Sequence, residues 1–426
     1  MLNHALMPDT QAILLLCASF GQALSKEPKP LTLREYNELA SWLRDLKMRP
    51  ADLLTQAGKE RLQTITTDRL NPNLLVALLE RGGMLALAVE KWTNQGLWVL
   101  GRSDDSYPRR LKEKLRHSAP AILYGVGNIE LLSLGGLAVV GSRDVDSEGL
   151  AYTNKVAQTC AEEGIQVVSG GARGVDAAAM LGGLEVGGTA VGVLADRLTK
   201  AAVSGDYRSG IREGRLTLVS AYDPDAGFNV GNAMGRNKYI YALADRALVV
   251  SSAFGNGGTW AGAIEALQRE NSVRVFVRMQ GSVPEGNRQL IKNGAKPFPK
   301  EPWNGSLKTL LESDASGEPE TQTDIAVTPS ESAAVATLEP KPSLVSTDAS
   351  EPKDIYEAVL PFILHHLESP KNTKSLAELL DVRGAQLEDW LKRAIAEGKV
   401  TKTTKPVAYV VNRKPTQLSL LEEEAK

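Results

Sequence analysis

The stretch "VVSGGARGVDAAAM", Val167–Met180, decides the fold. It opens with an apolar pair, continues through small residues, and ends in a run of alanines. This order is typical of a buried strand, a glycine-rich loop and a helix that begins where the loop ends. The one large side chain of the loop is Arg173. The stretch therefore predicts a strand-loop-helix unit whose loop is suited to contact a ligand.

The same alternation extends from about Leu137 to about Lys308. Apolar runs such as "LAVVGS", "TAVGVLA", "RALVVSS" and "VRVFVRM" are separated by helical patterns. Continuous Val, Ile and Leu runs between helices indicate a parallel sheet covered on both faces. We predict a doubly wound, Rossmann-like α/β domain.

Composition excludes several classes of protein. The chain has 426 residues and a net charge of −2, so a nucleic-acid site would have to be a local patch. Cys17 and Cys160 offer neither a metal-ligand spacing nor a disulfide framework, and we expect free thiols in a reducing compartment. The run "AILLLCASF" is too short to span a bilayer and predicts a buried helix. We expect a cytoplasmic protein without a membrane segment.

Five regions follow from the patterns along the chain. Residues 1–100 show helical apolar stripes, and residues 101–312 hold the Rossmann-like domain. Residues 313–352 are rich in Pro, Ser, Thr and acids, which predicts a disordered linker. Residues 353–412 predict three helices and a hairpin, the order of a winged helix, and residues 413–426 predict an exposed tail.

Ligands of such sheets bind at the carboxyl ends of the strands. Three of these ends read "GSRD", "SGGARG" and "FGNGGT". Glycines let backbone amides approach an anion, and arginine adds a charge with a fork geometry suited to phosphate. The alternative is that these glycines only make tight turns. The candidate anion-binding residues are Ser142, Arg143, Ser169, Gly170, Gly171, Arg173, Gly174, Gly257, Gly258 and Thr259.

Other chemistry finds little support in the sequence. Neither the dinucleotide spacing G-x-G-x-x-G after "VV" nor a Walker motif occurs. The four histidines, His4, His117, His365 and His366, lie outside the α/β segment. Asp176 is interpreted as a structural acceptor for loop amides. We therefore expect inert anion binding, with no catalytic residue, metal or cofactor.

Four motifs, "SYPRRLKEKLRHSAPAILYGVGN", "AVVGSRDVDSEG", "VVSGGARGVDAAAM" and "PEGNRQLIKNGAKPF", resemble the DprA/Smf (DNA processing protein A) family in order and spacing. The resemblance implies a Rossmann-like protein that binds single-stranded DNA, helps load the RecA recombinase and forms a dimer. It implies a strand-binding role for Ser142 and Arg143, for the loop of Arg173, and for the R-N-[RK] match. That match is formed by Arg236, Asn237 and Lys238.

The sequence also departs from the family's pattern. Met180 replaces a usual histidine, and "SSAFGNGGTWAGA" replaces a commoner motif, which suggests a member specialised away from transformation, for instance toward phage defence. The biological process stays open among DNA uptake, recombination and phage defence. Phe228, Tyr239 and Phe254 are candidates for base stacking.

Two alternatives belong to other classes of function. One is a phosphoribohydrolase of the LOG type, for which Glu265 would have to supply the carboxylate one helical turn beyond its usual place. The other is a nucleotide-binding sensor.

Two features near the carboxyl end concern partners. In the winged-helix-like module, Glu388 and Asp389 would repel phosphates, so protein contact competes with DNA reading as its role. In the tail, "QLSLL" at Gln417–Leu421 resembles the short peptides that dock on the bacterial sliding clamp.

Overall fold

The computed structural model describes residues 6–20, 28–67, 69–269, 273–301, 303, 306–313, 355–367, 370–380, 382, 384–404 and 407–412. The chain divides into two compact units, Met1–Glu320 and Thr321–Lys426. Apart from Ser313, the predicted linker lies outside the described residues, and so does the predicted tail with its Gln417–Leu421 peptide.

The N-terminal part of the first unit is helical, as predicted. Its elements are α1 (Pro8–Cys17), α2 (Leu33–Asp45), the 3-10 helix η1 (Pro50–Leu54), α3 (Gln56–Leu62), α4 (Pro72–Leu79) and α5 (Gly82–Asn94). The apolar residues Ala12 to Leu16 of α1 are buried, which confirms the predicted buried helix. A capping box between Thr32 and Glu35 starts α2.

A nine-stranded sheet follows, with the order β1-β2-β6-β5-β4-β3-β7-β8-β9. Strands β3 to β9 run parallel, as predicted, whereas β1 and β2 form an antiparallel extension next to β6 that no sequence pattern predicted. The strands are β1 (Trp98–Gly101), β2 (Ile122–Gly127), β3 (Leu137–Gly141), β4 (Val167–Ser169), β5 (Ala190–Leu194), β6 (Leu216–Ser220), β7 (Arg246–Ser251), β8 (Arg274–Val277) and β9 (Lys296–Pro297).

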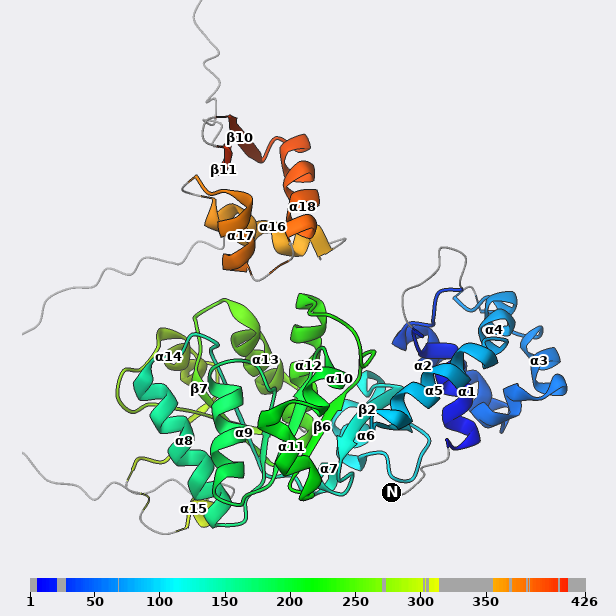
Figure 1. The fold of residues 1–426 in the computed structure, drawn as a ribbon, viewed down its shortest axis with the longest axis horizontal. Helices are drawn as coiled ribbons and strands as arrows, with labels where there is room; N and C mark the ends of the chain where they lie inside the picture. Colours follow the sequence, from blue (N-terminus) through cyan, green and yellow to red (C-terminus); the bar gives the residue numbers. More distant parts are fainter. Residues whose placement is uncertain are drawn as a thin grey trace, which may run out of the picture. The chain divides into compact units, whose positions relative to one another are not determined.

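Alternate residues of each strand enter two different cores because side chains alternate across a sheet. From β3, Leu137 and Val139 pack with α8 (Ser147–Glu162) and α9 (Val175–Glu185), which lie side by side (Figure 1). Ala138 and Val140 pack on the other face. That face is covered by α6 (Arg109–Leu115), α12 (Val230–Leu243) and α13 (Gly257–Gln268). Both faces are therefore covered, which explains the continuous apolar runs.

Shorter elements complete the unit. They are the 3-10 helix η2 (Arg116–Ser118), α7 (Leu131–Leu134), α10 (Leu198–Ala202), α11 (Gly205–Arg212), α14 (Glu285–Lys292) and α15 (Leu307–Ser313).

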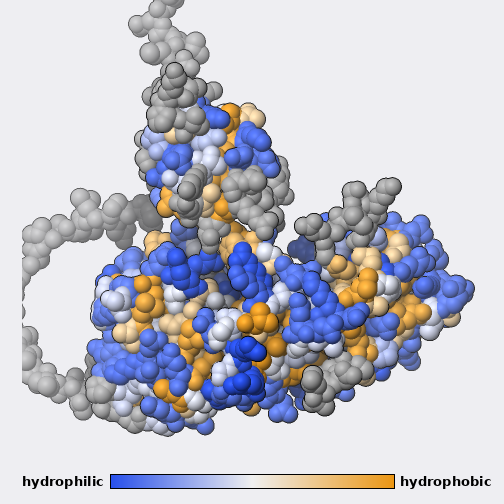
Figure 2. All heavy atoms as spheres, in the orientation of Figure 1, coloured by the Kyte–Doolittle hydropathy of each residue, from blue (hydrophilic) through white to orange (hydrophobic). Residues whose placement is uncertain are grey.

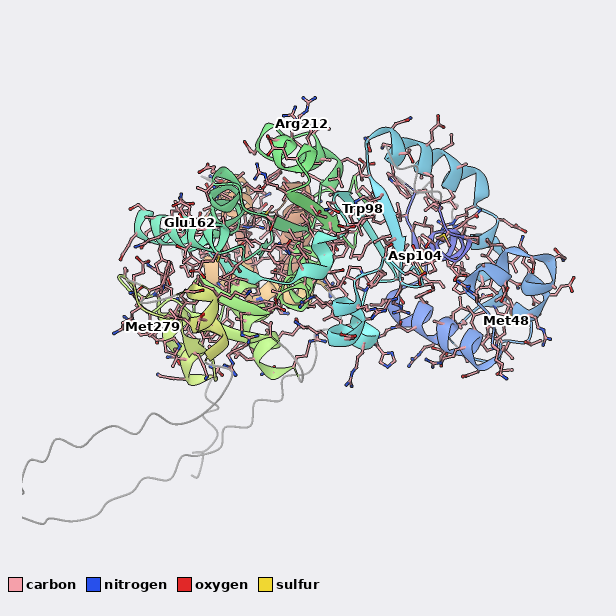
Figure 3. All side chains as sticks on the ribbon, turned by 90° about the horizontal axis from the view of Figure 1, so that it is seen from below. Met48, Trp98, Asp104, Glu162, Arg212 and Met279 are labelled. Atoms are coloured by element: carbon pink, nitrogen blue, oxygen red, sulfur yellow. The ribbon has the colours of Figure 1, made fainter. Side chains whose placement is uncertain are left out.

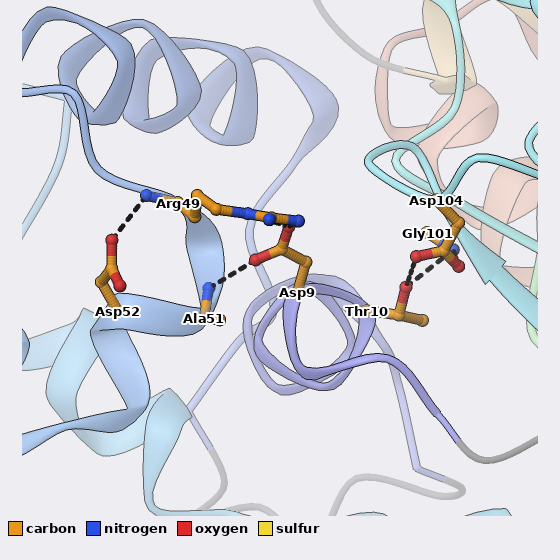
Figure 4. A network of polar contacts seen from close by, with 7 residues as sticks. All are labelled: Asp9, Thr10, Arg49, Ala51, Asp52, Gly101 and Asp104. Carbon is orange, nitrogen blue, oxygen red and sulfur yellow. Dashed lines mark hydrogen bonds and ion pairs between the residues drawn. The ribbon is translucent and has the colours of Figure 1, made fainter.

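Strand β1 joins the N-terminal helices to the sheet, and Figure 3 shows Trp98 and Asp104 between the two parts. In Figure 4 the Thr10 hydroxyl of α1 donates to Asp104 at 2.6 Å and accepts from the Gly101 amide at 3.2 Å. On the other side of α1, Asp9 pairs with Arg49 at 2.6 Å. The helix is thus held by hydrogen bonds to both parts, and β1 crosses the predicted boundary at residue 100.

The second unit contains α16 (Ile355–His366), α17 (Thr373–Leu380), α18 (Gly384–Ala396) and the antiparallel pair β10 (Val400–Thr404) and β11 (Val407–Val411). Its core includes Tyr356, Ile363, Leu376 and Leu391. The elements occur in the predicted order, and the winged-helix assignment stays a prediction.

Hydrophilic side chains cover much of the face seen in Figure 2, with smaller hydrophobic areas between them. Among the described residues no single helix is long and apolar enough to cross a membrane, and only α4 and α5 together, bent by 50°, reach that length and composition.

Candidate nucleic-acid interface

The strand order creates a switch point at β3, because the chain leaves β3 for β4 on one side and returns to β7 on the other. Crevices of this kind, outside the carboxyl ends of the strands, are the usual ligand sites of doubly wound sheets. We call the loops that follow β3, β4 and β7, residues 142–146, 170–174 and 252–256, the rim. These three loops contain most of the residues predicted to bind an anion.

The loop after β4 is organised around Asp176 in the first turn of α9. The carboxylate is buried and accepts hydrogen bonds from the backbone amides of Gly141, Gly170 and Ala172. Burial raises the pKa of Asp176, while Arg236 and these amides oppose that shift. These hydrogen bonds confirm the interpretation of Asp176 as a structural acceptor. The amides of Gly170 and Ala172 therefore already donate to a carboxylate of the protein.

Arg236 of α12 lies beneath the same loop and is 6% exposed. Its Nη1 donates to the Val193 carbonyl at 2.8 Å and is 3.8 Å from an Asp176 oxygen. Its Nε is buried without a hydrogen-bond partner among the described residues. Burial lowers the pKa of Arg236, and Asp176 opposes that shift. Gly170 makes the arrangement possible, because a Cβ there would lie 1.6 Å from Nη1 of Arg236.

Two arginines reach the surface of the rim. The side chain of Arg173 is 76% exposed and pairs with Asp144 of the neighbouring loop at 2.6 Å. The guanidinium of Arg143 lies 5.0 Å from the centre of the Phe228 ring, in a cation–π contact. Gly174, with φ of +86°, lets the α9 loop pass against the carbonyls of Ser142 and Arg143, where a Cβ would meet both oxygens.

The loop after β7 leads into the amino end of α13. The cap residue Asn256 makes no side-chain hydrogen bond to this helix. Thr259 donates from its hydroxyl to the Gly141 carbonyl at 3.0 Å, and Asn237 donates to the Gly258 carbonyl at 2.8 Å. These bonds tie α13 to β3 and α12 while leaving the helix end without a side-chain cap, which suits it to an anion.

Phe254 precedes this helix and is 57% exposed. Its ring lies 5.2 Å from that of Trp260 at an interplanar angle of 87°. Trp260 holds the exposed ring of Phe254 next to the amino end of α13. The ring offers a flat apolar surface beside a helix end that is suited to a negative charge.

Asn287 supports the rim from below. It lies in the motif "PEGNRQ", but the sequence alone did not single it out as a functional residue. It is fully buried, accepts from the Ser252 amide at 3.0 Å, and donates to the Val250 and Arg278 carbonyls. The motif therefore fixes the ends of β7 and β8, and its signal in the sequence is an asparagine at the start of an otherwise amphipathic helix.

The structure brings some predicted residues to the rim surface and buries others. Arg143, Arg173 and the start of α13 lie at the rim, whereas the Ser169 hydroxyl is fully buried and donates to the Val139 carbonyl at 2.5 Å. Lys238 lies away from the rim in a groove with Glu265. The prediction that Tyr239 could stack on a base is wrong, because Tyr239 is 6% exposed and belongs to the core under the sheet.

Glu265, which the LOG-type alternative would need beside the strand ends, does not lie there. This carboxylate accepts from Arg269 at 2.5 Å in the same groove as Lys238. Since α13 continues away from the rim by a turn beyond Gly262, its side chains there face α6 and α12 instead.

Comparison with known proteins identifies the family of this chain. A family model described as "DNA recombination-mediator protein A" matches residues 98–303, which include the whole rim. DNA processing protein DprA of Streptococcus pneumoniae is 31% identical over 198 residues, 45% of this chain and 68% of that protein. The chain belongs to the DprA/Smf family.

Two solved DprA structures are similar to part of this chain. The crystal structure of DprA from Streptococcus pneumoniae covers 68% of this chain and 94% of its own, with a TM-score of 0.53 and 22% identity, and shows the same fold. A structure of DprA from Helicobacter pylori, described by its single-stranded DNA binding mode, covers 51% of this chain and 95% of its own, with 22% identity and a TM-score of 0.42.

Proposed function

We propose that this chain binds single-stranded DNA through the rim, as a recombination mediator of the DprA type without catalytic activity. The observation that carries the proposal is the convergence of Arg143, Arg173 and the uncapped start of α13 at one switch point. Membership in a family of DNA recombination-mediator and DNA processing proteins supports it.

The chemistry of the rim suits a phosphate backbone. An uncapped helix end and two guanidinium groups offer directed N–H donors to phosphate oxygens. Phosphate contacts position a strand without reading its sequence, so binding should tolerate different bases. A net charge of −2 is compatible with this, because only the rim must attract phosphate.

Two aromatic rings fit the bases of the same strand. Phe254 is exposed beside α13, and Phe228 lies under Arg143, so each ring is next to a group suited to phosphate. Stacking on aromatic rings is the usual sequence-tolerant contact of single-strand binders. Duplex bases are already stacked and paired, so we expect a preference for single strands.

The positions of Glu265 and Asp176 disfavour the hydrolase alternative. Glu265 lies in the groove away from the rim, and Asp176 is buried against Arg236. A LOG-type reaction needs an accessible carboxylate beside the bound sugar, and neither residue meets that need. The nucleotide-sensor alternative is tested by the binding assay below.

Partner binding belongs to the same proposal. The protein would act as a homodimer in the cytoplasm and would transfer the single strand bound at the rim to a RecA-type recombinase. The C-terminal unit would contact DNA or protein. The family description as a recombination mediator supports a recombinase partner. The sliding-clamp contact through residues 417–421 stays a separate prediction, to be checked by calorimetry of a peptide covering residues 414–426.

The test compares Arg143→Ala with Arg212→Ala. Arg212 is exposed at the end of α11, and Figure 3 shows it at the surface. Because it comes just before β6, it lies toward the amino ends of the parallel strands, whereas the rim follows their carboxyl ends. Losing one phosphate contact should lower the affinity of Arg143→Ala for single strands of any sequence and flatten the salt dependence by about one unit or less. Arg212→Ala should bind like the wild type.

Gel shifts with a single strand, a duplex and a mononucleotide over a salt series provide the measurement. Equal losses in both variants would show that general charge, and not the rim, governs binding. Tight binding of the mononucleotide alone would replace the proposal with the sensor alternative.

A further inference from the structure

Five cations gather where the N-terminal helices meet the sheet, and we call them the basic surface. They come from α2, from the turn after β1, from α6 and from the first residue of η2: Arg34, Arg102, Arg109, Lys112 and Arg116. On α6 the apolar residues Leu111 and Leu115 are buried in the core. Arg109 is exposed and Lys112, one helical turn later, is partly exposed.

Hydrogen bonds hold these separate segments together. Nη1 of Arg102 donates to Oδ1 of Asn37 at 2.8 Å, and Nδ2 of Asn37 donates to the His117 carbonyl at 2.8 Å. Asn37 follows Arg34 by one helical turn on α2, and His117 follows Arg116 directly. The guanidinium of Arg102 therefore lies between α2 and η2, and the cations form one continuous surface.

Three of these arginines are open to a partner. Arg34, Arg109 and Arg116 are exposed. Their side chains form neither an ion pair nor a hydrogen bond with any residue that the structure describes. Their charges are therefore available to an anionic ligand.

Most acids near the basic surface are occupied by other groups. Asp104 accepts a hydrogen bond from α1 (Figure 4), Glu35 caps α2, and Glu38 lies 3.8 Å from an arginine between α3 and α4. Asp105 and Glu113 are the exposed acids of the turn after β1 and of α6. Cations therefore outnumber the acids that could neutralise them.

The backbone of Arg116 provides an independent observation. Its φ is +49°, a conformation that residues other than glycine rarely adopt. Its side chain is exposed and contacts no described residue through a hydrogen bond or an ion pair, so the fold gains nothing from it that glycine would not supply. Residues held in such conformations cluster at functional sites. The property of Arg116 that remains is its exposed charge.

The basic surface lies at the same edge of the sheet as the rim. Strand β2 pairs with β6 in the antiparallel direction, with Tyr124 opposite Ser220. The start of β2 and the end of β1 therefore lie toward the carboxyl ends of the parallel strands, and Arg102 follows β1 directly. Strand β1 is five positions from β3 in the sheet, which is about 24 Å at the usual strand spacing. A nucleic acid longer than this can contact both sites.

The surroundings of the cations favour a duplex as the partner. Arg102 and Lys112 lie over the rings of Tyr36 and Tyr107, which are only 2% and 1% exposed, so neither ring can stack on an unpaired base. Within the described residues 33–45 and 102–118 no large apolar side chain is exposed, and a protein interface would need an apolar centre. Phosphates on the outside of a duplex need only the cations.

We propose that the basic surface binds the phosphate backbone of a DNA duplex, beside the single strand held at the rim. The site goes beyond the rim function, because none of its five cations belongs to the rim. Only the placement of the duplex beside a single strand rests on the proposed function. The matching substrate is a duplex that carries a single-stranded overhang.

The experiment is fluorescence anisotropy of the full chain with a labelled duplex over a salt series. We expect wild type to bind a duplex of about 20 base pairs with a dissociation constant on the order of 10 μM at low salt. The double variant Arg109→Gln with Arg116→Gly should weaken duplex binding about tenfold and flatten the salt slope by about two units, because two phosphate contacts are lost.

Lys47→Gly with Arg61→Gln is the matched control. Lys47 also has a positive φ, of +57°, and both residues are exposed cations. Figure 3 shows the neighbouring Met48 in the outer part of the N-terminal helices, away from Asp104. The control should bind the duplex like wild type. Melting temperatures of both double variants should stay close to that of wild type, because glycine accepts a positive φ and the changed side chains are exposed.

Arg143→Ala separates the basic surface from the rim. It should keep the duplex affinity and lose single-strand affinity, whereas the double variant should do the reverse. The duplex with an overhang should bind wild type more tightly than either part alone. Unchanged single-strand binding in Arg143→Ala would refute the rim without affecting the duplex result.

Four outcomes would overturn the proposal. Wild-type duplex affinity in the double variant would remove these arginines from the site, and an equal loss in the control would assign binding to general charge. Equal losses of duplex and single-strand binding in the double variant would make the basic surface part of the single-strand path. Absence of duplex binding by wild type would leave an acidic protein as the partner.

Discussion

Two glycine-rich loops of the rim look alike in sequence but differ in what they hold. The loop of residues 170–174 gives the amides of Gly170 and Ala172 to the buried carboxylate of Asp176. The loop of residues 252–256 ends at α13, whose cap residue Asn256 makes no side-chain bond to the helix. The first loop has its anion inside the protein, and the second presents donors to the outside.

The difference shows that glycine content alone does not identify an anion site. The decisive feature is whether a nearby acid already occupies the donors. In the first loop, Asp176 occupies the donors, and its carboxylate also forms an ion pair with the buried Arg236. The loop of Arg173 therefore contributes to binding mainly through that side chain, while the β7–α13 loop contributes backbone donors.

Asp176→Ala should give the largest effect. It removes the acceptor of the loop amides and the ion-pair partner of the buried Arg236 guanidinium. Breaking a buried pair costs about 3–5 kcal/mol in the free energy of unfolding. Urea denaturation measures it, and a loss under about 1 kcal/mol would mean that the first loop is not organised by this acid.

Gly170→Ala and Gly258→Ala form a matched pair, one in each loop. The Cβ at position 170 would lie 1.6 Å from Arg236, whereas that at 258 meets only the Asn237 amide nitrogen at 3.2 Å. Overpacking should cost Gly170→Ala about 1–3 kcal/mol, and Gly258→Ala much less. Melting curves of both variants give the comparison, and equal losses would contradict the difference between the loops.

Phe254→Ala should weaken single-strand binding by about 1 kcal/mol, the lower end of what one stacked base contributes. Stability should change little, because the ring is 57% exposed. Fluorescence anisotropy with a labelled oligonucleotide provides the measurement. Leu87→Ala, at a 70% exposed leucine of α5, is the control, and an equal effect of the two changes would remove Phe254 from the site.

Asp144→Ala should have the smallest effect and the opposite sign. Asp144 pairs with Arg173 at the surface and competes with phosphate for it, and both side chains are mostly exposed. Surface pairs are weak, so removing the acid should tighten single-strand binding by only about twofold to threefold. The same anisotropy assay at low salt detects this change, and weaker binding would show that Asp144 positions Arg173 instead.

Much of the fold could be predicted because its signals are local. The apolar runs from Leu137 onward predict the parallel strands, and the helical stripes of the first hundred residues predict α1 to α5. Strands β1 and β2 escaped prediction because they extend the sheet by antiparallel pairing with residues that are distant in the sequence. Their partners are set by tertiary contacts that no local pattern contains.

The sequence by itself determined the strand–loop–helix order, the loops that form the rim and the arginines that these loops carry, because periodicity and glycine placement act over a few residues. Only the tertiary structure decided which side chains reach the surface. Arg236 is buried under Gly170, and the amides of Gly170 and Ala172 donate to Asp176. Lys238 lines the groove between α6, α12 and α13 together with Tyr241. The direction of a side chain depends on how its helix is rotated against the sheet, and that rotation is fixed by packing among segments far apart in the chain.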